Sequence, residues 1–169
     1  MVEVSTKVRN TVPLGELEQL YTSRQARFRR VAFALLRDQE DAREAVQEAF
    51  ARAVRAQASF RGEGELEAWV WRTLTNICLD AKRQHARRNG AGAVEGEPAV
   101  EESGALGEQV RAAVGLLPER QRLVLFLRYY ADLPYEGIGQ VLGIERGTVA
   151  ATLHAAHASL QETMKEVAR

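Results

Sequence analysis

Aromatic and basic side chains gather in one stretch of the sequence, between residues 69 and 88. Trp69 and Trp71 lie two residues apart, and the basic segment KRQHARR follows at residues 82–88. Aromatic rings beside cations can stack on unpaired bases, as binders of single-stranded nucleic acid require. Trp69 falls on an apolar helical stripe, which favours a core role, whereas Trp71 lies off that stripe and could be exposed.

A second candidate is the segment 136–157, which has the spacing of a helix-turn-helix. Gly139 is small where two helices must cross closely, and Gly143 can adopt the left-handed conformation of the turn. Ile138, Ile144 and Val149 would fill the wedge between the helices. The second helix of such a motif reads the major groove of duplex DNA. An ordinary helical hairpin with a glycine turn is the alternative.

The sequence lacks the combinations of side chains that catalysis requires. We find no nucleophile, no paired general acid and base, no phosphate-cradling glycine loop and no cluster of metal ligands. His154 and His157 lack further zinc ligands, because Cys78 lies in another part of the chain. We therefore expect a protein that is not an enzyme and binds no cofactor or metal.

The elements that must position these residues are helices. The hydrophobic fraction is 46%, only 4 residues are Pro, and no long run alternates apolar with polar residues as a half-buried strand would. Three apolar stripes of helical spacing occur between residues 14 and 88, and four shorter helices are expected between 105 and 169. We predict an all-α protein of two small domains: a three-helix bundle and a four-helix domain that contains the helix-turn-helix.

Residues 89–104 have the composition of a linker. They include four glutamates but no basic and no aromatic residue, so they cannot bury enough apolar surface to fold. We predict a leader over residues 1–13, a front module over 14–88, a flexible acidic linker over 89–104 and a rear module over 105–169.

Net charge, cysteine content and hydropathy limit which partners and which cellular compartment we expect. With 23 basic and 23 acidic residues the net charge is zero, so total charge alone gives no reason to expect a nucleic-acid partner. The single Cys78 excludes an internal disulfide. No apolar stretch reaches the roughly 18 residues that span a bilayer, and the N-terminal segment lacks a secretion signal. We expect a cytoplasmic chain without membrane insertion.

Three strings carry a resemblance to a known family: DAREAVQEAFARAV (41–54), FRGEGELEAWVWRTLTNICLDAKR (60–83) and LPERQRLVLFLRYYADLPYEGIGQVLGIERGTV (117–149). The front module resembles region two, and the rear module region four, of the extracytoplasmic-function (group IV) class of RNA polymerase sigma factors. The match covers most of the chain outside leader and linker, in the family's order. It implies an alternative sigma factor that binds core RNA polymerase and directs promoter recognition and transcription initiation.

The resemblance also implies three surfaces. The outward face of the helix expected at residues 41–54 would dock on the clamp helices of the polymerase through Asp41, Glu44, Gln47 and Glu48. The alternative is that this face is merely solvated, as charged helix faces often are. The minus-ten promoter element, with one base flipped out, would contact Phe60, Arg61, Gly62, Glu63, Glu65, Leu66, Arg72, Asn76, Lys82, Arg83, Arg87 and Arg88. The minus-thirty-five element would contact Arg146, Thr148, Val149, Ala151, Thr152 and His154.

The recognition helix departs from the family pattern. Family members usually carry several Lys or Arg here, but this sequence has none between Arg146 and Lys165. Each phosphate that a cation neutralises strengthens binding, so we expect weak upstream contact and promoter choice mainly through the minus-ten element. If His154 and His157 face DNA, upstream contact would strengthen in mildly acidic solution. The alternative is that both histidines are merely exposed.

Two other functions stay open at this point. A sigma-like interaction protein would bind polymerase or an anti-sigma factor but have weakened promoter binding. A free-standing helix-turn-helix repressor fits the rear module but leaves the front module unexplained, and it would need dimer symmetry. The expected partners are core RNA polymerase, through its clamp helices and flap, and promoter DNA. Anti-sigma factors are common antagonists in the resembled family and are a further candidate partner.

Overall fold

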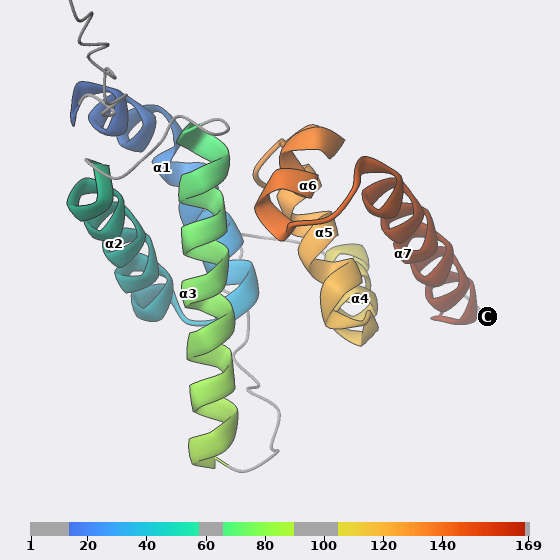
Figure 1. Ribbon diagram of the computed structural model, residues 1–169. Coiled ribbons are helices and arrows are strands. Elements are labelled where there is room, and N and C mark those ends of the chain that lie inside the picture. The colour runs from blue at the N-terminus through green and yellow to red at the C-terminus, as the bar shows by residue number, and fades with distance from the viewer. Residues whose placement is uncertain (1–13, 58–65, 90–104, 168–169) are drawn as a thin grey trace, which may run out of the picture.

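The computed structural model describes residues 14–57, 66–89 and 105–167, and these ranges form seven α-helices and their connections (Figure 1). No strand occurs within these ranges, so the predicted all-α class is confirmed. The leader, most of the predicted linker and residues 58–65 lie outside the described residues.

The first three helices, called the front helices below, are α1 (Leu14–Leu36), α2 (Gln39–Ala56) and α3 (Leu66–Asn89). All three contact one another around an aromatic core. The ring of Phe28 has its centroid 5.2 Å from Phe50 and 4.1 Å from Trp71. Large rings bury much apolar surface, so this cluster is a principal source of the stability of the bundle.

The second helix begins at a side-chain cap. The backbone amides of Glu40 and Asp41 each donate a hydrogen bond of 2.8 Å to the carboxylate of Asp38, the N-cap residue of α2. These bonds satisfy amides that have no partner within the helix. Residue 37 completes the turn in the left-handed region (φ 63°), and its amide donates to the carbonyl of Phe33 at the end of α1.

One of the two tryptophans of α3 differs from the expectation, because Trp71 is more deeply buried than Trp69. Trp71 is fully buried against Phe28, and its indole N–H donates to Glu67 Oε1 at 3.2 Å. Trp69 is only partly buried. The expectation that Trp71 could be exposed is therefore wrong. The reason is that α3 turns the side of Trp71 towards Phe28 of α1, so its buried stripe lies slightly round the helix from the predicted one.

The remaining four helices, called the rear helices, are α4 (Ala105–Leu116), α5 (Glu119–Tyr129), α6 (Tyr135–Leu142) and α7 (Arg146–Val167). Pro118 and Pro134 are the N-cap residues of α5 and α6, where a missing backbone N–H costs nothing. α7 packs on α4, α5 and α6 through its buried side (Figure 1). The side chains of that packing include Val149, Leu153 and Ala156.

The predicted helix-turn-helix is formed by α6 and α7. Gly143 ends α6 in the left-handed conformation (φ 66°), and the amide of Ile144 donates to the carbonyl of Gly139 at 3.0 Å. A Cβ atom at Gly139 would lie only 2.6 Å from the backbone oxygen of Ile144. Both glycines thus have the roles that the sequence indicated, because the turn needs one left-handed residue and one close backbone approach.

Front and rear helices pack against each other and share one hydrophobic core. α3 lies beside α6, and α1 contacts α5 (Figure 1). Arg27 of α1 reaches the loop before α6, where its Nη1 donates to the carbonyl of Ala131 at 3.4 Å and lies 3.5 Å from the Asp132 carboxylate. The predicted minus-ten helix α3 is therefore part of the junction between the two groups of helices.

Candidate polymerase and nucleic-acid interface

The outer face of α2 presents the residues that the sequence indicated for polymerase docking. Glu44 and Gln47 are exposed and make no hydrogen bond or ion pair within the described chain. Glu48 instead accepts from Arg52 at 2.7 Å and from Arg55 at 3.2 Å, and these bonds, that from Arg52 foremost, lower the pKa of its carboxyl group. The open part of this face is thus small and centred on Glu44 and Gln47.

Asp41, the first residue of the predicted docking face, contacts another helix. Its Oδ2 atom lies 3.7 Å from Nε2 of His85 on α3. Both side chains are partly exposed, so the pair joins α2 to α3 at the surface without closing access to Asp41. Such a contact contributes little to stability but orients the carboxylate.

Two cations expected to contact the minus-ten element are bound to the rear helices. Arg72 donates to the backbone carbonyl of Gln140, and its Nε donates to that of Val141 at 3.4 Å. These carbonyls belong to the last turn of α6, where they have no partner in the helix and the helix dipole attracts a cation. Lys82 forms an ion pair of 2.7 Å with Glu119, at the start of α5.

The C-terminal end of α3 is open and basic. Arg83 pairs with Asp80 on its own helix at 3.0 Å, whereas Asn76, Arg87 and Arg88 are exposed and make no such contact within the described chain. Leu66, at the start of α3, packs half-buried on the core. The other residues expected at the minus-ten site lie outside the described residues: Phe60, Arg61, Gly62, Glu63 and Glu65.

On α7 the predicted recognition residues divide into exposed and buried groups. Thr148, Ala151 and His154 are exposed, and the half-buried Thr152 donates its hydroxyl to the carbonyl of Thr148 at 2.7 Å. Val149 has no exposed surface. Its assignment to DNA contact is therefore corrected: it packs in the core of the helix-turn-helix, the other role that its spacing indicated.

Arg146, the one cation expected on this surface, is partly neutralised. Its Nε lies 2.9 Å from the carboxylate of Glu136 on α6. Both side chains are well exposed, so the pair is weak and can exchange for a phosphate. The exposed start of α7 therefore carries little net charge, as its sequence indicated.

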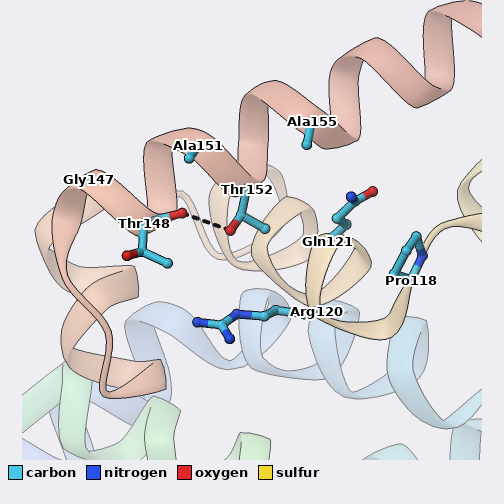
Figure 2. A pocket seen from close by; sticks show the side chains of 8 residues that line it. All are labelled: Pro118, Arg120, Gln121, Gly147, Thr148, Ala151, Thr152 and Ala155. Atoms are coloured by element: carbon cyan, nitrogen blue, oxygen red, sulfur yellow. Dashed lines mark hydrogen bonds between the residues drawn. The ribbon is translucent and has the colours of Figure 1, made fainter.

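A hollow of about 580 Å³ lies beside the exposed part of α7 (Figure 2). Its α7 side is made of small residues, among them Gly147, Ala151 and Ala155, and its other side is the first turn of α5. Small side chains allow a close approach by another surface, and alanine can contact the methyl group of thymine. The lining residues are Pro118, Arg120, Gln121, Gly147, Thr148, Ala151, Thr152 and Ala155.

Arg120 is a candidate binding residue that sequence reasoning missed. Its side chain extends along the hollow on the side facing Thr148 (Figure 2), is exposed, and makes no ion pair or hydrogen bond within the described chain. It thus places an unpaired cation beside residues 147–164 of α7, which include no Lys or Arg. Arg120 belongs to α5, outside the helix-turn-helix, so the spacing of residues within that motif gave no signal for it.

The two histidines of α7 have different surroundings. His154 is exposed on the outward side, three residues after Ala151. His157 lies beside α5, with its Nε2 atom 2.9 Å from the hydroxyl of Tyr129. His157 is exposed, but its Nε2 atom is engaged by Tyr129, whereas the side chain of His154 makes no such contact within the described chain.

Within the described residues, none of the helices is long and apolar enough to cross a membrane. The same residues contain no group of three or more histidine, cysteine or acidic side chains placed to hold a metal ion.

Comparison with protein-family models gives two matches that follow each other along the chain. Residues 20–88 match the model of sigma-70 region 2, and residues 107–160 match that of sigma-70 region 4. The first match covers most of the front helices and the second covers most of the rear helices.

The curated relatives that this chain matches are also sigma factors. The chain is 30% identical over 155 residues to the ECF RNA polymerase sigma factor SigE of Mycolicibacterium smegmatis, covering 86% of this chain and 60% of that protein. It is 29% identical over 147 residues to the ECF RNA polymerase sigma-E factor of Escherichia coli, covering 76% of each. SigV of Bacillus subtilis is 26% identical over 131 residues, which cover 76% of this chain and 79% of SigV.

Two solved structures have a similar fold. The sigma factor RpoE in complex with the anti-sigma factor NepR from Bartonella quintana superposes with a TM-score of 0.74 at 22% identity, covering 90% of this chain and 98% of RpoE. CnrH, in complex with the cytosolic domain of CnrY, gives a TM-score of 0.69 at 19% identity, covering 94% of this chain and 93% of CnrH.

Proposed function

This chain belongs to the extracytoplasmic-function family of RNA polymerase sigma factors, and we propose on that premise how its helices divide the work of promoter recognition. The chain is an alternative sigma factor, so its partners are core RNA polymerase and promoter DNA. Catalysis belongs to the polymerase and not to this chain, and we place the chain in the cytoplasm. The observation that carries the proposal is the open basic end of α3, where Arg87 and Arg88 are exposed.

In this proposal α3 makes the main DNA contact, at the minus-ten element. Arg87 and Arg88 neutralise phosphates of the melted strand first, because they are exposed in the packed arrangement. Arg72 and Lys82 are bound to α6 and α5, and movement of the rear helices away from α3 would release both. Separation of front and rear helices therefore precedes full engagement of the minus-ten element.

The rear helices make a weaker contact upstream. The small outward residues of α7 enter the major groove, and Arg120 at the start of α5 binds a backbone phosphate beside them. Arg146 adds a second phosphate contact once it leaves Glu136. Two cations supply less counterion release than the several cations usual on such a surface, so the upstream contact is weak.

The outer face of α2 is the proposed docking surface for the polymerase clamp helices, and the rear helices are proposed to reach the flap. Glu44 and Gln47 carry the first contact, because they are exposed and form no ion pair or hydrogen bond in the described chain. An anti-sigma factor is a further proposed partner, since RpoE, a sigma factor of similar fold, is seen in complex with the anti-sigma factor NepR. It would act by keeping α2 or α3 covered.

Transcription from a promoter library tests the proposal. The purified full chain is mixed with core polymerase, and start sites are mapped. We expect specific start sites, and we expect Glu44→Lys to reduce both core binding and initiation. Glu18→Lys is the matched control, because Glu18 is also exposed, lies on α1 and forms no ion pair in the described chain.

The same experiment separates the alternatives. Core binding without initiation would favour a sigma-like interaction protein, a function that the nearly neutral outer face of α7 also fits. Binding to duplex DNA without core binding would favour a repressor. Equal loss of core binding by Glu18→Lys and Glu44→Lys would contradict the proposed docking face on α2.

A further inference from the structure

Three arginines lie near one another where α1 contacts α5. Arg37 follows the last residue of α1, Arg111 lies on α4 and Arg122 lies on α5. All three side chains are half-buried. Arg111 and Arg122 are both close enough to Arg37 to act on its charge, and α1 contacts α5 directly at this junction.

The three guanidinium groups have no carboxylate partner within the described chain. Arg122 Nη1 donates to the backbone carbonyl of Gly115 at 2.9 Å, while the side chain of Arg37 makes no hydrogen bond or ion pair. Arg111 Nη1 is completely buried and has no hydrogen-bond acceptor. A buried cationic donor without an acceptor is costly and rare in folded proteins.

The positive charges of these arginines repel one another. Burial, then the charge of Arg122 and, more weakly, that of Arg111 lower the pKa of the Arg37 guanidinium, against an opposing effect of Tyr130. Arginine stays charged at neutral pH, so two further positive charges act on that of Arg37. Arg37 also has left-handed backbone (φ 63°), which a residue with a side chain seldom adopts.

We propose that Arg37, Arg111 and Arg122 form a binding site for a phosphate-bearing anion. Planar guanidinium groups bind phosphate oxygens through paired hydrogen bonds, and a dianion between three cations would remove their repulsion. It would also supply the acceptor that Arg111 Nη1 lacks. The exposed Tyr130, close to Arg37, offers a hydroxyl donor at the rim.

The site would join front to rear helices, because Arg37 belongs to the first group and the other two arginines to the second. An anion bound to all three would favour the packed arrangement over the separated one, by the preference of any ligand for the state that binds it better. The phosphate could belong to a small molecule, such as a nucleoside diphosphate, or to a nucleic-acid backbone. This inference does not depend on the promoter contacts proposed above.

Titration calorimetry of the full chain with inorganic pyrophosphate tests the site. We expect binding to the unaltered chain, and we expect Arg37→Gln and Arg111→Gln each to weaken it by about tenfold or more, because each removes a charge-assisted hydrogen bond. Arg29→Gln is the matched control, since Arg29 is exposed on α1 away from the cluster and makes no contact in the described chain. Arg122 is left unchanged because it also caps α4.

The outcomes distinguish the sources of the phosphate. The same variants are titrated with a single-stranded oligonucleotide: weaker binding of pyrophosphate alone indicates a small-molecule site, and weaker binding of both indicates that nucleic-acid phosphate also occupies it. Circular dichroism confirms that each variant is folded, and Arg111→Lys tests whether charge alone suffices. Absence of pyrophosphate binding to the unaltered chain, or equal weakening by Arg29→Gln, overturns the proposal.

Discussion

The helices α3 and α7, both proposed to contact DNA, differ in how charge and access are combined. α3 carries five Lys or Arg residues between positions 72 and 88, but Arg72 and Lys82 are bound to the rear helices. α7 has an open outer face, yet Arg146 is the only Lys or Arg before Lys165. Only part of the charge on α3 is accessible, and the accessible face of α7 carries little charge, so neither helix is fully competent in the packed arrangement.

The largest effect is expected when the Trp71 ring, which packs α3 against α1, is removed. Trp71→Ala removes a fully buried ring packed on Phe28 and should lower the free energy of unfolding by about 3 to 5 kcal/mol. Trp69→Ala, at a partly buried position on the same helix, should cost clearly less. Urea denaturation followed by circular dichroism measures both. Equal losses would contradict the different burial of the two tryptophans.

The corresponding change in the rear helices is Gly139→Ala. Its Cβ would meet the backbone oxygen of Ile144 at 2.6 Å, so the turn between α6 and α7 must shift, and we expect a loss of about 1 to 3 kcal/mol in stability. Gly115→Ala is the control, because a Cβ there meets no atom within 4 Å. It should be neutral or slightly stabilising in thermal denaturation. A harmless Gly139→Ala would show that the close approach of α6 and α7 is not required.

A smaller effect, on DNA binding, is expected when the positive charge of Arg120 beside α7 is removed. Arg120→Gln should weaken binding of duplex promoter DNA and lower the slope of log K against log salt concentration by about 1, the change for one lost phosphate contact. Fluorescence anisotropy at several salt concentrations measures the slope. The control Arg29→Gln should leave it unchanged, and a slope equal to that of the unaltered chain would remove Arg120 from the interface.

The smallest effect on stability concerns the contact between Lys82 and Glu119. Glu119→Gln should cost under about 1 kcal/mol, because the pair is partly exposed. It should nevertheless strengthen binding of single-stranded minus-ten DNA, since Lys82 is released and a nearby negative charge is lost. Glu108→Gln on α4, exposed and without an ion pair in the described chain, is the control. Unchanged DNA binding would mean that this contact does not restrain α3.

The same ion pair has a predictable pH dependence. The hydrogen bond from Lys82 lowers the pKa of Glu119 below its ordinary value of 4.5. A lowered folded-state pKa means that the stabilisation is fully present above pH 4.5 and is lost as the pH falls through the folded value. The stability difference between the unaltered chain and Glu119→Gln should therefore vanish in acid. A difference that persists there would contradict an electrostatic origin.

Local sequence determined the helices, the cap at Asp38 and the turn at Gly143. Each depends on residues a few positions apart: helical spacing of apolar side chains, a short carboxylate before a helix, and a glycine that tolerates positive φ. The neutral outer face of α7 was also evident from the sequence, because exposure of a polar or small side chain opposite an apolar stripe follows from helix geometry alone.

Tertiary structure decided what the sequence could not: which tryptophan is buried, which cations are free, and which arginines meet. Trp71 is buried because α3 turns that side towards Phe28 of α1, and this orientation depends on a neighbouring helix. Arg72 contacts a carbonyl 68 residues away, and Arg37 meets Arg111 and Arg122 from other helices. Such contacts depend on how helices pack against one another, and no spacing along a single helix encodes them.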